Sequence, residues 1–166
     1  MLVTQPPSPR RESGMVLLEA LIAILIFSLG VLGMVGINAR AVEAATDARF
    51  RADAARFVSD IASVIALRVD RTTSATLTNT LTPFQHQPGG SNCAFTGDAS
   101  GNADVTAWIA RVSAAGRTGL PGATAARQQI KVETGATDYN RVTITVCWQG
   151  PGDPVVRQHS LITYIN

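Results

Sequence analysis

The chain has 166 residues, enough for one membrane-anchored domain but not for two large ones, and its formal net charge is +2. Lys131 is the only lysine and no basic cluster follows a nucleic-acid backbone, so no nucleic-acid contact is indicated. His86 and His159 lack the spacing of metal ligands, and the two cysteines lack the spacing of redox or zinc motifs. No Gly-rich loop is expected to open a helix. We therefore expect no bound metal, no cofactor and no enzymatic activity.

A short polar segment, residues 1–14, precedes a long apolar run over residues 15–37. The run contains one carboxylate, Glu19, and one hydroxyl, Ser28. It is long enough to span a bilayer as a helix, which takes about 20 residues. Two arginines before the run place the N-terminus in the cytoplasm and the rest of the chain outside, by the positive-inside rule.

A cleaved secretory signal is the alternative for this region. The triplet Ala39-Arg40-Ala41 has the small-residue pattern of a signal-peptidase site. The apolar run is longer than the roughly 7–15 residues of such a signal, which favours a membrane-spanning helix.

Glu19 is the informative residue of the run, because a charge within a membrane helix needs a function or a partner. An acid near the middle costs about 2.5–3.5 kcal/mol, and less near the end, where its carboxylate can reach the head groups. If the chain is cut after Gly14, Met15 becomes a cationic N-terminus one helical turn from Glu19. Opposite charges about 4 Å apart attract by about 4 kcal/mol at an effective dielectric of about 20, within one chain or between neighbouring chains.

Residues 14–23 resemble the class III signal of type IV pilins and pseudopilins. That signal is a short basic leader ending in glycine, followed by a phenylalanine-threonine-leucine-leucine-glutamate start. The residues that match are Gly14, Leu17, Leu18 and Glu19, and those that depart are Met15 and Val16. The resemblance implies that prepilin peptidase cuts between Gly14 and Met15, that Met15 is N-methylated, and that Glu19 assists subunit docking.

Residues 104–122 and the strand at residues 142–148 resemble, more loosely, minor pilins of the PilV kind. This implies a minor pilin that acts in the initiation of pilus assembly, beside other minor and major pilins. The chain is then expected in inner-membrane lipid, with a cytoplasmic N-terminus and a periplasmic head, before it enters the pilus. The alternatives are a pseudopilin of type II secretion, and an unprocessed membrane-tethered periplasmic binding protein.

Residues 38–71 are expected to continue the long helix as an amphipathic half that ends near residues 69–71. Its apolar residues recur at steps of three and four. They are Phe50, Ala54, Phe57, Val58, Ile61, Val64 and Ile65. Charged pairs four residues apart occupy the other faces, and each adds about 0.2–0.5 kcal/mol to the helix. They are Asp47–Arg51, Arg49–Asp53 and Arg56–Asp60.

Residues 72–103 are rich in Thr, Gly, Ser and Pro, which predicts a connecting loop with little regular structure. The loop contains Cys93, and the other cysteine of the chain is Cys147. Outside the cytoplasm a disulfide is permitted, and two cysteines allow a single intramolecular pairing. The alternative is two free buried thiols.

Residues 104–166 are expected to complete the head with a small helix and a sheet. Asp104 is predicted to cap a helix that stops near Gly116, with Trp108 packed against the sheet or the long helix. Strands are predicted at residues 129–134, 141–149 and 155–165. Short turns between them predict an antiparallel meander. The expected fold is therefore α+β and pilin-like, with a long N-terminal helix packed against a C-terminal antiparallel sheet of about three to four strands.

Overall fold

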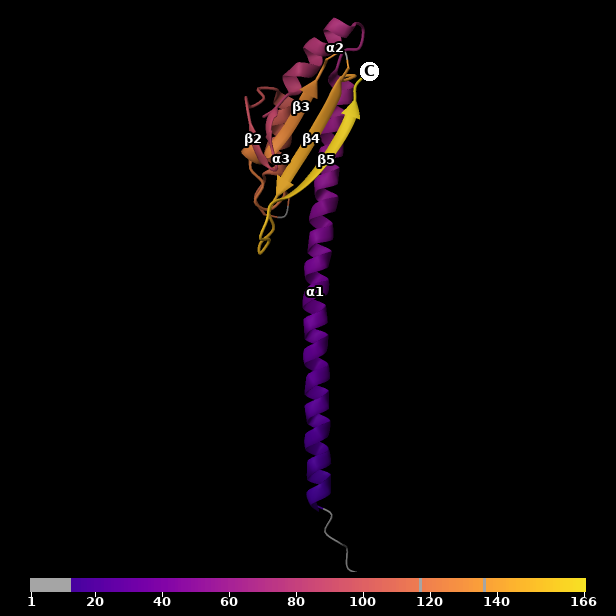
Figure 1. The fold of residues 1–166 in the computed structure, drawn as a ribbon, viewed down its shortest axis with the longest axis vertical. Coiled ribbons are helices and arrows are strands. Elements are labelled where there is room, and N and C mark those ends of the chain that lie inside the picture. The colour runs from indigo at the N-terminus through magenta and orange to yellow at the C-terminus, as the bar shows by residue number, and fades with distance from the viewer. Residues whose placement is uncertain (1–12, 117, 136) are drawn as a thin grey trace, which may run out of the picture. The chain divides into compact units, whose positions relative to one another are not determined.

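The computed structural model describes residues 13–116, 118–135 and 137–166. The chain divides into two compact units, Met1–Ala45 and Thr46–Asn166, and the second is called the head below. Helix α1, Ser13–Arg68, contributes to both units (Figure 1). The fold is α+β, with a long apolar N-terminal helix and a C-terminal antiparallel sheet, as predicted.

The first unit consists, over its described residues, of the apolar part of α1. This is the one helix in the described chain that is long and apolar enough to cross a membrane, and none of its apolar stretch is buried. Ser28 does not leave its hydroxyl unsatisfied, because Oγ donates to the carbonyl oxygen of Ile24 at 2.7 Å. The polar group in the apolar run is therefore compatible with lipid.

The part of α1 in the head is amphipathic, and its buried face is the predicted stripe. Its buried residues are Ala54, Phe57, Val58, Ile61 and Ile65, while Phe50 and Val64 are partly buried. The predicted charged pairs are present, with nitrogen–oxygen distances of 3.0 Å for Arg51–Asp47, 3.6 Å for Arg49–Asp53 and 3.9 Å for Arg56–Asp60. The helix ends at Arg68, one residue before the predicted region.

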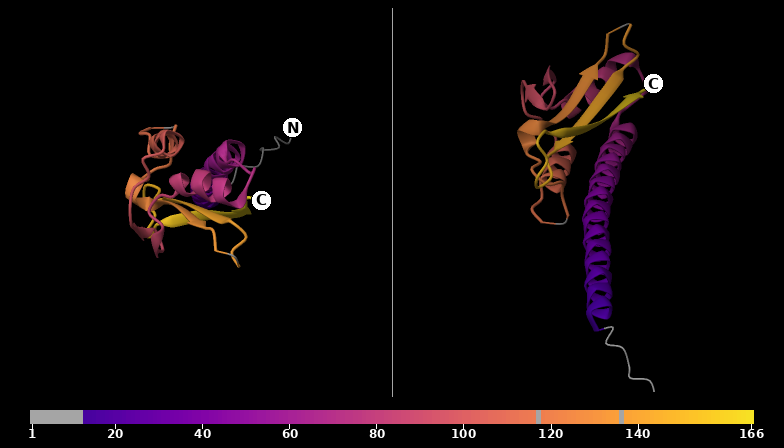
Figure 2. Two further views of the ribbon diagram at one scale, coloured as in Figure 1. Left: turned by 90° about the horizontal axis from the view of Figure 1, so that it is seen from above. Right: turned by 60° about the horizontal axis from the view of Figure 1, so that its bottom comes forward.

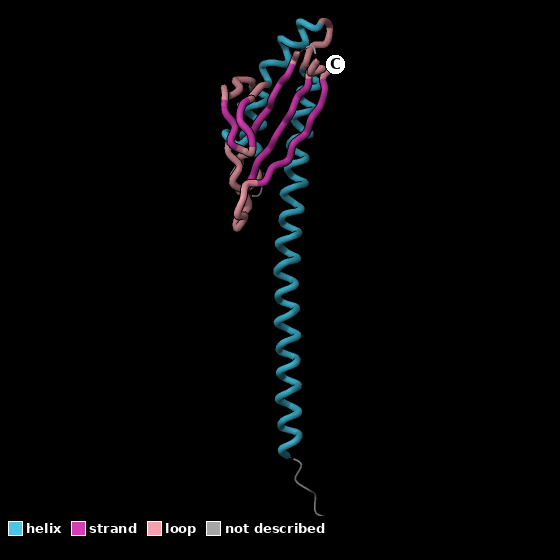
Figure 3. Tube along the Cα trace, in the orientation of Figure 1, coloured by secondary structure: helices cyan, strands magenta, loops and turns pink. Residues whose placement is uncertain are grey.

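The prediction that residues 72–103 have little regular structure is wrong. They form α2 (Ser74–Leu81), the 3-10 turn η1 (Thr82–Phe84), and the hairpin strands β1 (Gly89–Ser91) and β2 (Ala94–Thr96) (Figure 3). Threonines start α2: the Thr76 N–H donates to Thr73 Oγ1 at 3.1 Å, and the Thr73 N–H donates to Thr76 Oγ1 at 3.0 Å. This reciprocal capping satisfies donors that would otherwise be free at the helix start.

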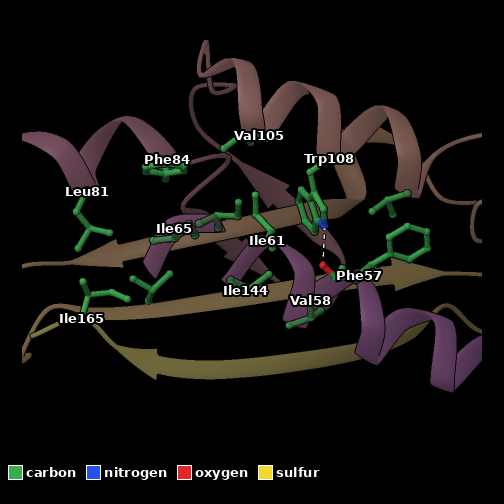
Figure 4. Packing of buried hydrophobic residues seen from close by; sticks show 14 of the residues in the cluster. Phe57, Val58, Ile61, Ile65, Leu81, Phe84, Val105, Trp108, Ile144 and Ile165 are labelled. Carbon is green, nitrogen blue, oxygen red and sulfur yellow. Dashed lines mark hydrogen bonds between the residues drawn. The ribbon is translucent and has the colours of Figure 1, made fainter. Parts of the chain in front are cut away.

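Helix α3, Ala103–Val112, packs against α1 within the head. Its cap is Asn102 and not Asp104, because Asn102 Oδ1 accepts the N–H of Asp104 at 2.9 Å. The helix also stops at Val112, before the expected end. Trp108 packs on α1 as predicted, and its Nε1–H donates to the Phe57 carbonyl oxygen at 2.9 Å (Figure 4).

The main sheet has three antiparallel strands in the order β3 (Gln128–Glu133), β4 (Arg141–Trp148) and β5 (Arg157–Tyr164), preceded by the 3-10 turn η2 (Ala125–Arg127). These bounds lie within two residues of the predicted strands. The register places Ile130 opposite Ile144, and Ile144 opposite Leu161.

The sheet's inner face carries the core residues of β4, which are Val142, Ile144, Val146 and Trp148. The helices of the head cover this face, and the β1–β2 hairpin lies on the other (Figure 2). The hairpin is a second, two-stranded sheet that the sequence did not predict. Both faces of β4 are therefore covered over part of their length.

Candidate functional site

The predicted processing segment lies in the first turns of α1. Met15 and Glu19 are four residues apart on this helix, so they lie about one turn from each other on the same side. Met15 is 75% exposed and Glu19 is also exposed. A Cβ built at Gly14 meets no described atom within 4 Å. Packing within the described chain therefore gives no reason for glycine at this position.

The apolar residues after Met15 form a continuous exposed surface around α1. Every large apolar side chain from Met15 to Ile37 is exposed, between 44% for Val31 and 75% for Met15. An apolar surface of this extent is not stable in water and marks contact with a membrane or with other proteins. The helix can exchange lipid for other apolar helices at little hydrophobic cost, because the two surroundings are similarly apolar.

Glu19 has no ion-pair partner among the described residues, although it lies in the apolar surface. Its carboxylate is therefore available for a cation from outside the described chain. The chain is uncleaved at this position in the structure, so the Met15 nitrogen is a peptide nitrogen within α1. Only cleavage would turn that nitrogen into a cation.

The predicted pairing of the cysteines is confirmed. Cys93, in the turn between β1 and β2, is bonded to Cys147 of β4, with Cα atoms 5.9 Å apart. A second attachment lies beside the disulfide, where the Gln129 amide donates to the carbonyl oxygens of Gln87 at 2.9 Å and Gly89 at 3.1 Å. The hairpin is thus fixed to the outer face of the main sheet at two points.

His86 is a structural residue whose role the sequence did not reveal. It is only 2% exposed. Its Nδ1 accepts the Ser100 N–H at 3.1 Å, and its Nε2 lies 3.1 Å from the Ala125 carbonyl oxygen. Since a carbonyl oxygen only accepts, these contacts fit a neutral ring with its proton on Nε2. His86 thereby joins three segments of the head.

Metal binding has no support in the described residues. They contain no group of three or more His, Cys, Asp or Glu side chains that could hold a metal ion. His86 uses both ring nitrogens in the contacts above, and His159 lies half-buried on β5.

An ionic network that sequence reasoning missed joins α1 to the start of β5. Arg157 donates to Asp153 through Nε at 3.0 Å and Nη2 at 2.9 Å, and its Nη1 lies 3.1 Å from Asp47 Oδ1. Asp47 also pairs with Arg51 at 3.0 Å. The hydrogen bond from Arg157 lowers the pKa of Asp153 from its ordinary value. The sequence showed only the local Asp47–Arg51 pair, since no pattern links positions so far apart.

Comparison with known proteins gives no match to a family model, a curated protein or a solved structure. The class of protein is therefore defined by its own features. It is an α+β protein with an exposed, membrane-length apolar helix and a disulfide-bonded head. The residues of functional interest are Gly14, Met15 and Glu19, at the start of that helix.

Proposed function

We propose that this protein is a minor pilin, a non-enzymatic structural subunit that acts in the initiation of type IV pilus assembly. Prepilin peptidase cuts it between Gly14 and Met15, and the new N-terminus is methylated. The observation that carries the proposal is the combination of this cleavage sequence with Glu19 inside an exposed apolar helix surface. The chain first resides in the inner membrane with its head in the periplasm, and then enters the pilus beside other minor and major pilins.

The chemistry of assembly follows from charge and packing. Before cleavage, Glu19 has no cationic partner among the described residues and lies in a lipid-compatible helix. Cleavage creates the Met15 amine, and at a separation of about 4 Å the amine and the Glu19 carboxylate attract by about 4 kcal/mol at an effective dielectric of about 20. A pair formed between neighbouring chains fixes the register of helices whose apolar surfaces alone are poorly specific.

The disulfide supports the periplasmic placement of the head. Structural disulfides persist in oxidising compartments, of which the bacterial periplasm is one. The arginines before the apolar run favour the same orientation, because basic residues stay on the cytoplasmic side.

Replacing Gly14 with leucine tests the cleavage. We expect the Gly14→Leu chain to insert in the membrane but to retain residues 1–14, which intact-mass and N-terminal analysis of the membrane fraction will detect. Gly30→Leu is the matched control, because Gly30 also lies in α1 with no described atom within 4 Å of a built Cβ. It should mature normally. A wild-type chain that keeps residue 1 while pili form contradicts the proposal.

Replacing Glu19 with glutamine tests the docking role, because it removes the charge and keeps the shape. Insertion and processing should be unchanged, while incorporation into sheared pili should fall at least about tenfold, a change that corresponds to 1.4 kcal/mol. Glu43→Gln is the control, since Glu43 is also an exposed carboxylate of α1 in the same unit. Undiminished incorporation of the Glu19→Gln chain would remove Glu19 from its proposed role.

The same strains separate the alternatives. Normal pili with defective protein secretion in a deletion strain would indicate a pseudopilin of type II secretion. A functional chain that begins at Met1 would indicate a membrane-tethered binding protein.

A further inference from the structure

The head contains a cleft of about 620 Å³ between α1 and α3. Its volume falls within the range of about 300–1,000 Å³ typical of ligand sites. The residues that line it are Arg49, Asp53, Arg56, Phe57, Ala110, Arg111, Ala114 and Thr118. The hydrogen bond from Trp108 Nε1–H to the Phe57 carbonyl oxygen holds the two helices together beside it. The cleft is therefore a built feature of the head.

The lining is strongly positive, with three arginines and one aspartate. Arg49 and Arg56 pair with Asp53 at 3.6 Å and Asp60 at 3.9 Å, but these ion pairs are exposed and contribute little. Arg111 is exposed and makes no ion pair or hydrogen bond through its side chain within the described chain. The cleft thus concentrates a positive charge as large as the net charge of the whole protein.

The chemistry of the cleft favours a carboxylate carried on a peptide. Guanidinium groups bind carboxylates through two parallel hydrogen bonds, which lysine cannot do. Phe57, Ala110 and Ala114 add apolar atoms to the lining of the cleft, and this suits apolar side chains that flank an acid in a protein segment. A nucleic acid requires a longer track of basic side chains, whereas the cleft has three arginines and the whole chain has a net charge of only +2.

We propose that the α1–α3 cleft is a docking site for an acidic segment of another protein subunit. The proposal rests on the proposed function, which places neighbouring subunits around the head. Charge complementarity carries it: Arg111 supplies a cation without a described partner, Arg56 adds a second cation that is 74% exposed, and the occupant supplies aspartate or glutamate. Docking through the head then adds a specific contact to the less selective packing of the apolar helix.

Site-specific photo-crosslinking in cells that make pili tests this docking. A photoreactive residue at Ala110, an exposed position of the cleft, should give an adduct whose mapped peptide from another subunit contains aspartate or glutamate. Arg111→Glu should reduce the adduct yield at least about tenfold, because it replaces an attractive charge pair across the interface with two like charges. Changing the mapped acid to arginine in the partner should restore the yield with Arg111→Glu.

Two variants control for folding and for general charge effects. Arg111 lies in the last turn of α3, where a cation favours the helix, so Arg111→Gln is the milder second variant and should also reduce the adduct. Arg71→Glu changes an exposed arginine outside the cleft and should alter the yield less than about twofold. The mobility of the disulfide-bonded form on non-reducing gels verifies that each variant folds.

Three results would overturn the inference: no protein adduct at Ala110, an adduct to nucleic acid, or an adduct that Arg111→Glu and Arg111→Gln leave unchanged. N-terminal analysis of the same samples separates this failure from failure of the proposed function. Chains that begin at Met15 without a cleft adduct refute the cleft alone, whereas functional chains that begin at Met1 refute the pilin proposal.

Discussion

Removal of the disulfide should destabilise the head by an amount that its loop length sets. The double variant Cys93→Ala with Cys147→Ala opens a bridge that spans 54 residues. In the chain-entropy treatment, a loop of this length contributes about 4 kcal/mol at 25 °C. Alanine suits position 147 better than serine, because the site is fully buried and a serine hydroxyl would need a partner.

The size of the head converts this free energy into a melting shift. About 120 residues in the head and roughly 2.1 cal/mol/K of unfolding entropy per residue give a fall in Tm of about 16 °C. Intrinsic fluorescence of the full chain in detergent reports this transition selectively. The chain has two tryptophans, Trp108 and Trp148, and both are buried in the head.

Reduction provides the control. A reductant should lower the Tm of the wild type to that of the double variant and leave the double variant unchanged. If the fully oxidised wild type, verified by intact mass, melts within about 4 °C of the double variant, the entropic reasoning is refuted, since that shift corresponds to only about 1 kcal/mol.

Two further predictions concern single groups in the head. Trp108→Phe removes the hydrogen bond to the Phe57 carbonyl oxygen, whereas the Trp148 Nε1–H has no partner among the described residues. Trp108→Phe should therefore lower the free energy of unfolding by about 1 kcal/mol more than Trp148→Phe does. Urea unfolding followed by circular dichroism measures both. Equal losses would contradict this assignment. Arg157 lowers the pKa of Asp153 in the folded head. The Arg157–Asp153 interaction therefore stabilises the folded head at pH values above the unfolded pKa of about 3.9, and this stabilisation is lost as the pH falls through the lower folded pKa. Arg157→Gln should flatten the dependence of Tm on pH below about 4, and an unchanged slope would count against it.

Periodic features of the fold could be predicted from the sequence. The buried stripe of α1 repeats at helical spacing, and the strands of the main sheet alternate and are bounded by turn residues. Both patterns are local in the sequence, so they can be recognised without knowledge of the tertiary contacts. The exposed surface around residues 15–37 is likewise a direct consequence of an unbroken apolar run on one helix.

The segment 72–103 could not be predicted because distant residues hold it in place. Its helix is short, and its capping box uses Thr76 where glutamate or glutamine is usual. Its hairpin depends on Cys147 and Gln129, which lie far along the chain. Composition alone therefore indicated a loop.

The candidate site was predicted unevenly for the same reason. Gly14, Met15 and Glu19 lie close together in sequence, so their arrangement on one helix could be read from spacing. The basic cleft combines Arg49 and Arg56 of α1 with Arg111 of α3, and only the packing of those helices brings them together. The Asn102 cap was also missed, since Asp104 offered an equally plausible cap two residues later.

The backbone contact of His86 makes the two edge strands of the main sheet, β3 and β5, differ in how they are paired. The His86 N–H donates to the Ile130 carbonyl oxygen at 2.9 Å, and the Ile130 N–H donates to the His86 carbonyl oxygen at 3.0 Å. The middle of β3 is therefore already paired along the edge that faces away from β4. β5 pairs with β4 and with no other strand of the described chain. Within the described chain, β5 is therefore the edge strand of the main sheet whose full length carries no β-bridge on its outer edge, and an unpaired strand edge is where an extended segment of another chain can pair.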